Sequence, residues 1–310
     1  MIHVNKYNYL LFLFLVISFQ LPAQQARVNA GTLKHFEQFK SKYVSARNVD
    51  VWLPEDYQST KKYPVLYMHD GQMLFDTSVN WNKQEWGIDE TMQELINQKI
   101  ISPCIVVGIW NAGLERHTDY LPKKVFETLT PYQQDTLLQV KAYGSNKLFT
   151  GKMQSDKYLR FLVYELKPFI DSSFSTLSDQ PNTFIAGSSM GGLISMYAIC
   201  EYPQVFGGAA CLSTHWPGIF TLHNNPIPAA MLQYFDSHLP DPSNHRLYFD
   251  YGTQTLDTMY EPFQLQANKS LKAHGYHAGN WITKAFPGEA HTENAWRKRF
   301  YIPASFLLKK

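Results

Sequence analysis

Cysteine is scarce in this sequence: the 310 residues contain three, Cys104, Cys200 and Cys211. An odd number does not fit a disulfide framework, although Cys200 and Cys211 could pair in an oxidising compartment. All three have apolar neighbours, which is typical of buried, unreactive thiols. Neither C-x-x-C nor H-E-x-x-H spacing occurs, so we expect no bound metal and no cofactor.

Neither sign of charge dominates the chain, which carries 28 Lys and Arg against 26 Asp and Glu. We therefore expect no nucleic-acid partner, because such a partner calls for a strongly basic surface. Repeats, low-complexity linkers and charge blocks are also absent after the first two dozen residues. With 45% hydrophobic residues, residues 24–310 are expected to form a single domain with one large core.

Long apolar runs are missing except near the start, where residues 10–19 are apolar. This run is about half of the roughly 20 residues that a membrane-spanning helix needs. A positive Lys6 before it and the small-residue site Leu21-Pro22-Ala23 after it indicate a secretory signal peptide over residues 1–23. We expect the mature protein to begin near Gln24, in the periplasm or outside the cell, without a membrane span.

From about residue 45, segments typical of strands alternate with segments typical of helices. This alternation predicts an α/β fold with a mostly parallel central sheet and helices on both faces. In such sheets the ligand site lies at the carboxyl ends of the strands. The expected strands are 47–53, 63–68, 104–109, 183–186, 206–212, 246–251 and 281–286, and the expected helices are 89–99, 158–169, 193–199, 261–274 and 292–308.

Aromatic residues are plentiful, at 15% of the chain, and many lie between residues 111 and 152. This region has few periodic signals, so it is expected to be either an ordinary packed insertion or a lid or wall of the cleft. As a cleft wall it would offer the rings of Tyr120, Phe126, Tyr132 and Tyr143. Trp216, just after strand 206–212, is also expected near the site, where it could stack on a substrate ring.

The most informative segment is Gly187-Ser188-Ser189-Met190-Gly191, which joins an apolar strand to an apolar helix. A strand, a G-x-S-x-G turn and a helix form the nucleophile elbow of α/β-hydrolases, which exposes a strained serine above the sheet. The two glycines let the strand and the helix approach each other around Ser189. Because Met190 opens the helix, its N–H and the helix dipole are expected to point at a developing oxyanion.

A nucleophilic serine needs a histidine base that is oriented by a carboxylate, and in this fold the chain order is serine, acid, histidine. Of the 11 histidines, His291 lies between the last strand and the last helix, where the order requires the base. For the acid we favour Asp257, in the loop after strand 246–251. Asp250 on that strand and Glu261 four residues after Asp257 remain alternatives.

The loop after strand 63–68 is expected to supply the other oxyanion donor. It reads His69-Asp70-Gly71-Gln72, and by analogy with the H-G-type loops of esterases Gly71 and Gln72 offer candidate N–H groups. With the N–H of Met190 they would complete an oxyanion hole.

These motifs belong to a larger set that spans the chain from about Arg47 to Phe306. The set comprises Tyr67-Met68-His69-Asp70-Gly71-Gln72 with Phe75, Trp86-Gly87-Ile88-Asp89-Glu90, Val106-Val107-Gly108-Ile109 with Asn111 and Arg116, residues 187–192, Tyr202-Pro203 with Phe206, Gly252-Thr253, and His291 with Trp296. As a set it resembles the putative-esterase family, which includes esterase D, feruloyl and acetylxylan esterases and enterochelin-type siderophore esterases, with mycolyltransferases as relatives.

The resemblance implies a serine-hydrolase triad of Ser189, Asp257 and His291. Some members of the family carry the acid directly after Gly-Thr-x, where this chain has Thr255. Arg116, which is part of the resembling set, joins Trp216 and Tyr120 as a candidate substrate-binding residue.

We therefore expect a secreted or periplasmic serine esterase that forms an acyl-enzyme. Its substrate would be a carbohydrate-linked acyl or feruloyl ester or a siderophore-type ester, and the sequence leaves this choice open. Two alternatives remain: an acyltransferase that passes the acyl group from the same serine to a glycan, and a non-catalytic glycan- or siderophore-binding protein. The sequence gives no indication of the oligomeric state.

Overall fold

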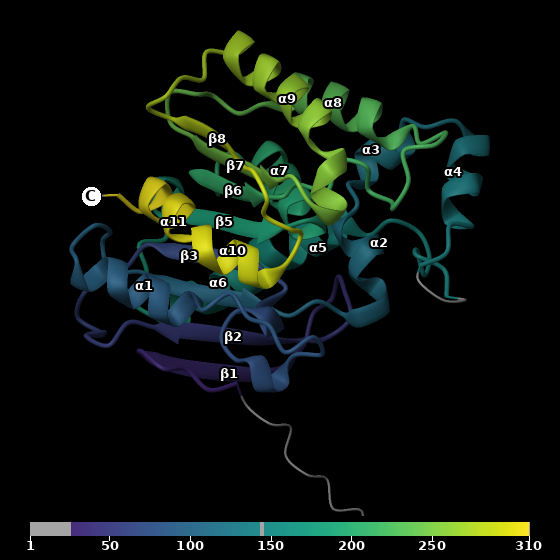
Figure 1. Cartoon of the computed structure of the whole chain (residues 1–310). Helices are drawn as coiled ribbons and strands as arrows, with labels where there is room; N and C mark the ends of the chain where they lie inside the picture. The colour runs from purple at the N-terminus through teal and green to yellow at the C-terminus, as the bar shows by residue number, and fades with distance from the viewer. Residues whose placement is uncertain (1–25, 143–145, 310) are drawn as a thin grey trace, which may run out of the picture.

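The computed structural model describes residues 26–142 and 146–309, and the expected signal peptide lies outside them. An eight-stranded sheet, in the order β1-β2-β4-β3-β5-β6-β7-β8, runs through the described chain (Figure 1). The strands from β3 to β8 pair in parallel, and β2 pairs antiparallel with both of its neighbours. The strands are β1 Thr32–Phe39, β2 Arg47–Leu53, β3 Val65–His69, β4 Ile105–Ile109, β5 Thr183–Ser188, β6 Gly208–Leu212, β7 Arg246–Gly252 and β8 Trp281–Phe286. The predicted α/β fold with a mostly parallel sheet is confirmed.

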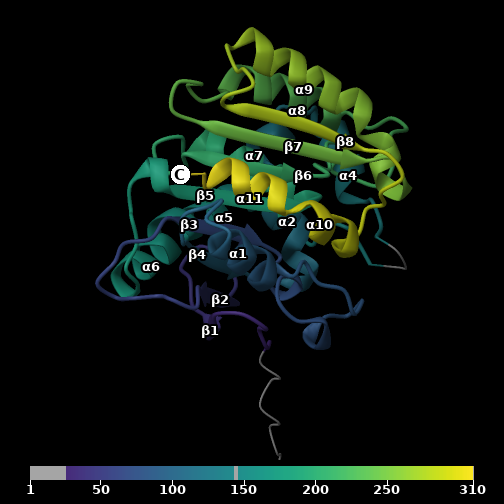
Figure 2. The ribbon, with the colours of Figure 1, turned by 60° about the vertical axis from the view of Figure 1, so that its left-hand side comes forward.

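Helices cover both faces of the sheet, as Figures 1 and 2 show. On one face α7 packs on β5 and β6, and α8 packs on α7 and α9, whereas on the other face α11 packs on β6, β7 and α1. The helices are α1 Ile88–Asn97, α2 Arg116–Tyr120, α3 Lys123–Glu127, α4 Pro131–Leu138, α5 Ser155–Phe161, α6 Lys167–Ser173, α7 Met190–Glu201, α8 Ile227–His238, α9 Glu261–Ala273, α10 Glu293–Arg299 and α11 Tyr301–Leu307.

The alternation of side chains along each strand divides the hydrophobic core in two. In β3, Val65 and Tyr67 belong to the larger cluster on the α7 face, and Leu66 and Met68 belong to the smaller cluster on the α11 face. Every residue of β3 is buried. Continuous apolar strands with both faces covered are typical of parallel sheets, so the central strands are rigid supports for the loops at their carboxyl ends.

The structure also corrects parts of the sequence analysis. Residues 111–152, which show few periodic signals in the sequence, contain α2, α3 and α4, and α4 begins with a capping box formed by Thr130 and Gln133. The helix expected over 158–169 is divided into α5 and α6 by a π-helical turn at Leu162–Leu166. Pro168 follows this turn by two residues, and a proline cannot donate a backbone hydrogen bond and clashes with the preceding turn of an α-helix.

Besides α2, α3 and α4, the edge strand β1 and the helix α8 were not predicted. The three cysteines are free and buried, so the pairing of Cys200 with Cys211 is not formed. In the ranges 26–142 and 146–309, no helix is long and apolar enough to span a bilayer.

Candidate active site

Ser189 occupies a strained turn between β5 and α7. Its backbone has φ 57° and ψ −123°, a region that residues with a side chain rarely adopt. The turn is possible because Gly187 has no side chain: a Cβ there would lie 2.7 Å from the carbonyl carbon of Gly191. Backbone bonds fix the serine further, since its N–H donates to the carbonyl of Leu212 at 2.9 Å. The strain is therefore maintained by close packing of the strand against the helix.

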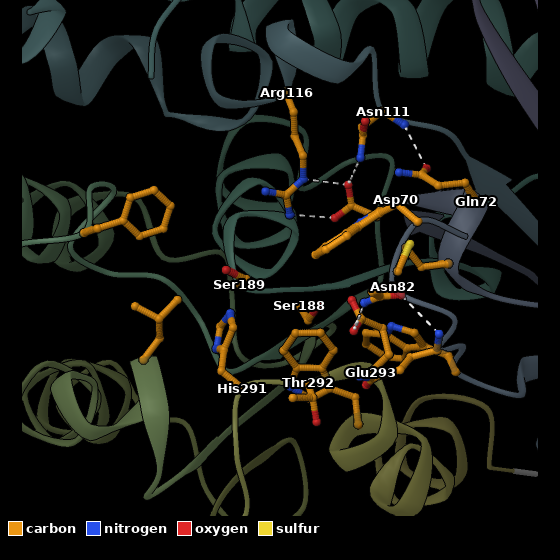
Figure 3. Close-up of a pocket in the computed structure, with 17 residues that line it drawn as sticks. Asp70, Gln72, Asn82, Asn111, Arg116, Ser188, Ser189, His291, Thr292 and Glu293 are labelled. Carbon is orange, nitrogen blue, oxygen red and sulfur yellow. Dashed lines mark hydrogen bonds and ion pairs between the residues drawn. The ribbon is translucent and has the colours of Figure 1, made fainter. Parts of the chain in front are cut away.

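His291 lies in the loop between β8 and α10, next to Ser189 in Figure 3. Its backbone N–H donates to Thr255 Oγ1 at 2.8 Å, and Nδ1 lies 2.5 Å from Asp257 Oδ1. The ring packs edge-on against Trp296, with centroids 5.0 Å apart. The imidazole is thus fixed in position and orientation, and its side chain is 11% exposed.

Asp257 is buried beneath His291. Its other oxygen, Oδ2, accepts hydrogen bonds from Ser213 Oγ at 2.6 Å and from the N–H of Gly252 at 2.5 Å. Burial alone would raise the pKa of Asp257, but the bonds from His291, Ser213 and Gly252 outweigh it and hold the pKa below its usual value. The carboxylate therefore stays ionised at neutral pH.

The two other carboxylates considered for this position have different partners. Asp250 forms a buried ion pair with Arg299, at 2.8 Å, and accepts a hydrogen bond from Tyr248 Oη at 2.9 Å. Glu261 accepts a bond from Tyr251 Oη at 3.3 Å.

Ser213 connects these groups, and the sequence analysis did not identify it. Its Oγ donates to Asp257 and accepts bonds from Trp296 Nε1 at 3.0 Å and Arg299 Nη2 at 2.9 Å. Its position directly after β6, at the carboxyl end of a central strand, was the available signal.

The loop after β3 is held in place by hydrogen bonds from Arg116 and Asn111, drawn at the top of Figure 3. The backbone of Asp70 adopts the left-handed conformation, with φ 57°. Its carboxylate accepts two hydrogen bonds from the guanidinium of Arg116, at 2.7 and 2.8 Å. Asn111 donates to Asp70 from its side chain at 2.8 Å and to Gln72 Oε1 from its backbone at 3.2 Å. Burial would raise the pKa of Asp70, but Arg116 and Asn111 lower it overall. Gly71 begins the short 3-10 helix that follows.

A cavity of about 500 Å³ opens above Ser189. Its lining includes Arg116 and Gln72, two of the candidate site residues. Apolar side chains such as Phe220 and Leu256 and the exposed Trp81 also belong to it. The full lining is Asp70, Gln72, Met73, Trp81, Asn82, Gln84, Trp86, Asn111, Arg116, Ser188, Ser189, Phe220, Leu256, His291, Thr292, Glu293 and Trp296.

Two residues expected to bind substrate lie in the core instead. Trp216 is 0% exposed, donates from Nε1 to Gln264 at 3.2 Å and stacks on Phe249. Tyr120 is also 0% exposed and packs against His69 and Tyr158. Both predictions were wrong, because neither a position after a strand, as for Trp216, nor an aromatic-rich segment, as for Tyr120, determines whether a ring turns toward the cavity or toward the core.

The other aromatic rings expected of the 111–152 segment do not line the cavity either, as far as the structure describes them. Phe126 is buried in the larger core cluster, and Tyr132 on α4 is exposed. Tyr143 lies outside the described residues. The segment reaches the cavity through the polar Asn111 and Arg116.

Comparison with known proteins places this geometry in a family. The family model described as Putative esterase matches residues 42–302. A curated relative, the endo-1,4-beta-xylanase/feruloyl esterase of Xylanibacter ruminicola, is 25% identical over 301 residues, which cover 93% of this chain and 33% of that protein. The chain thus spans about a third of the relative's length.

Solved structures share the fold. A ferulic acid esterase from Anaeromyces mucronatus superposes with a TM-score of 0.63 at 20% identity, covering 92% of each chain. An IroE-like serine hydrolase from Shewanella oneidensis gives a TM-score of 0.64 at 21% identity, covering 89% of this chain and 78% of that one. The match of the family model over residues 42–302 shows that this chain belongs to the putative esterase family, as a carboxylic-ester hydrolase with an α/β-hydrolase fold.

Proposed function

We propose that this esterase works through a catalytic triad of Ser189, His291 and Asp257. The observation that carries the proposal is the 2.5 Å contact between His291 Nδ1 and Asp257 Oδ1, next to a serine on a strained turn. With Nδ1 bound to the carboxylate, Nε2 is the basic nitrogen available to Ser189. The buried, ionised Asp257 stabilises the imidazolium that forms when His291 takes a proton.

The reaction proceeds in two halves. In the first, His291 takes the proton of Ser189 as Oγ attacks the ester carbonyl, and it then returns this proton to the leaving alcohol oxygen. An acyl-enzyme on Ser189 results. In the second half, water gives a proton to His291 and attacks the acyl group, and Ser189 regains its proton as the free acid leaves.

The oxyanion of each tetrahedral intermediate is held by backbone N–H groups. Met190 is the first residue of α7, where N–H groups have no acceptor within the helix and the dipole favours negative charge. Gln72 and Gly71 supply the second donor from the 3-10 turn after β3. Arg116 and Asn111, which bind Asp70, act here by holding this turn in place.

We infer that the alcohol part of the ester is a neutral carbohydrate. The indole of Trp81 is 86% exposed at the cavity, and Asn82 and Glu293, joined by a 2.8 Å hydrogen bond, lie on the same wall. An aromatic face beside amide and carboxylate groups suits a sugar, which presents C–H faces and hydroxyls. The relative from Xylanibacter ruminicola is an endo-1,4-beta-xylanase as well as a feruloyl esterase, which agrees with a carbohydrate ester.

Charge argues against an iron-loaded catechol siderophore, which is a polyanion. Arg116 is the cationic side chain among the described residues of the cavity wall, and Asp70 already pairs with it. Glu293 adds a negative charge to the opposite wall. Such a cavity would not attract a polyanion.

We also propose that the protein is exported after cleavage of residues 1–23. The positive start, the apolar run and the small-residue site support this. Terminal sequencing of the protein from its native host should find Gln24 first, whereas an intact Met1 would contradict export by this route.

Hydrolysis of p-nitrophenyl acetate by Ser189→Ala tests the proposed chemistry. We expect kcat to fall by about 10⁴-fold or more, because a residual rate remains from the oxyanion hole alone. The matched control is Ser172→Ala on α6, whose Oγ donates to the carbonyl of Phe169 and which should keep full activity. Undiminished hydrolysis by Ser189→Ala would contradict the triad.

A further inference from the structure

Tyr260 contacts the nucleophile but has no part in the triad. It directly precedes α9 and is 1% exposed. Its hydroxyl lies 2.7 Å from Nδ1 of His215 and next to the side chain of Ser189. Its ring packs edge-on against His291, with centroids 5.8 Å apart. One buried hydroxyl therefore lies between the nucleophile and a second histidine, beside the expected base.

His215 is itself tied to the nucleophile elbow. It follows β6 by three residues, is 1% exposed, and its backbone N–H donates to the carbonyl of Ser189 at 3.1 Å. The loop after β6 thus holds Ser189 in two ways: through the backbone, and through the hydroxyl of Tyr260.

Neither group exchanges a proton readily at neutral pH. Burial raises the pKa of Tyr260 well above its usual value, and the nearby Asp257 adds to this effect. Burial lowers the pKa of His215 well below its usual value, and the positive charge of Arg116 and of a protonated His291 or His117 lowers it further. A neutral phenol and a neutral imidazole can orient a hydroxyl but are poor proton carriers.

We propose that Tyr260 is a further catalytic residue, whose hydroxyl, anchored by the positioning residue His215, holds Ser189 Oγ in the rotamer that faces His291 and the ester carbonyl. A serine side chain has three staggered rotamers, and only one suits attack. Fixing that rotamer before the substrate binds lowers the barrier without adding any contact to the substrate. This inference rests on the proposed function, in which Ser189 is the nucleophile.

Tyr260→Phe tests the inference, because it keeps the ring that packs on His291 and removes only the hydroxyl. We expect kcat for p-nitrophenyl acetate to fall about 2- to 10-fold, the range for a hydrogen bond between neutral groups, with KM changed less than about twofold. Labelling of Ser189 by a fluorophosphonate should slow in parallel, because it reports on the nucleophile alone.

His215 variants test the anchor. His215→Leu should lower the rate as Tyr260→Phe does, and the double variant should be no slower than either single variant, because both remove the same bond. His215→Asn, whose amide can replace Nδ1, should recover most of the rate. Additive losses, or equal losses in the Leu and Asn variants, would overturn the role of His215.

Tyr276→Phe is the matched control for loss of a buried phenol. Its hydroxyl donates to the carbonyl of Pro240 at 3.0 Å, so this variant should lose thermal stability and keep its labelling rate. A Tyr260→Phe protein that is labelled at the wild-type rate or faster overturns the inference. Wild-type protein that is not labelled at Ser189 instead overturns the proposed function, so the two failures are distinguishable.

Discussion

At the residue scale, Asp257 differs from Asp250 in what its carboxylate faces. Asp257 accepts bonds from His291, Ser213 and the backbone of Gly252. Asp250 faces the buried guanidinium of Arg299. Removing each charge should therefore have a different consequence, catalytic for Asp257 and structural for Asp250.

Asp257→Asn should lower kcat by about 10³–10⁴-fold, because a neutral amide neither fixes the tautomer of His291 nor stabilises its protonated form. Steady-state hydrolysis of p-nitrophenyl acetate measures this loss, and Glu261→Gln is the control that should remain active. Asp250→Asn should instead destabilise the fold, by about 3–5 kcal/mol, since it leaves Arg299 buried without its charged partner. Catalysis lost with Glu261→Gln and kept with Asp257→Asn would contradict the assignment.

The sequence supported the roles proposed for Ser189 and His291 better than the choice of acid. The elbow motif and the chain order identify positions at strand ends, which local sequence can reveal. The choice among Asp257, Asp250 and Glu261 depends on which carboxylate meets His291 across the top of the sheet, and that is a property of packing. The same limitation explains why Trp216 and Tyr120 were wrongly placed in the site.

At the element scale, the elbow depends on close approach of β5 and α7. Gly187→Ala should place a Cβ 2.7 Å from the carbonyl carbon of Gly191 and 2.8 Å from its oxygen, atoms of the backbone that cannot move aside cheaply. We expect a loss of about 1–3 kcal/mol in stability and, because Ser189 shifts, a loss of about 10²-fold or more in kcat.

Thermal unfolding and ester hydrolysis measure these two effects. Gly151→Ala is the control, since a Cβ there meets nothing within 4 Å. Full activity in Gly187→Ala would show that the elbow does not need this contact.

A second element-scale feature is the attachment of the N-terminal segment to α1. The backbone N–H groups of Asn29 and Ala30 donate to Asp89 Oδ2 at 2.6 and 3.2 Å. Burial, with the neighbouring Glu90, raises the pKa of Asp89. A carboxyl whose pKa is raised on folding contributes stability at acid pH, and this stability is lost as the pH rises through the folded-state pKa.

Asp89→Asn should therefore be less sensitive to a change from pH 5 to pH 8 than the wild type. One pKa unit corresponds to about 1.4 kcal/mol, so we expect the melting temperature of the wild type to fall by about 2–4 °C more than that of the variant. Scanning calorimetry at the two pH values makes the comparison. If the melting temperatures of the wild type and of Asp89→Asn fell equally between pH 5 and pH 8, Asp89 would not titrate in this range.

The elements themselves were largely predictable. The strands β3 and β4 were identified because each is a continuous apolar run, and the helix α9 because its helical pattern extends over 13 residues. The edge strand β1 was not, because its residues are mostly exposed or half-buried and carry no apolar alternation. The short helices α2 to α4 have five to eight residues each, too few for periodicity to show.

At the scale of the whole molecule, the cavity lies where loops from distant parts of the chain meet. The turn after β3, the elbow after β5 and the His291 loop after β8 all contribute to its lining, together with Trp81, Asn82, Gln84 and Trp86. The parallel sheet brings these ends together at one edge. Trp81 lines this cavity but is not a member of the proposed triad, so its loss should weaken binding of the alcohol rather than the chemical step.

Trp81→Ala should raise KM for an ester of a carbohydrate about 2- to 10-fold, because stacking on a ring contributes about 0.5–1.5 kcal/mol. Hydrolysis of p-nitrophenyl acetate, which has no sugar to stack, should be unchanged. Tyr132→Ala, a similarly exposed ring on α4, serves as the control. A Trp81→Ala enzyme with the wild-type KM for the carbohydrate ester and the wild-type rate on p-nitrophenyl acetate would refute the carbohydrate assignment.

The most direct test of the central claim is to find which residue becomes covalently modified. Purified protein should be treated with a fluorophosphonate and digested, and the modified peptide should be identified by mass spectrometry. The triad predicts a single adduct on Ser189 that forms together with loss of esterase activity, and much more slowly in Asp257→Asn. Complete inactivation with the adduct on another residue, or persistent activity with Ser189 fully modified, would contradict the account.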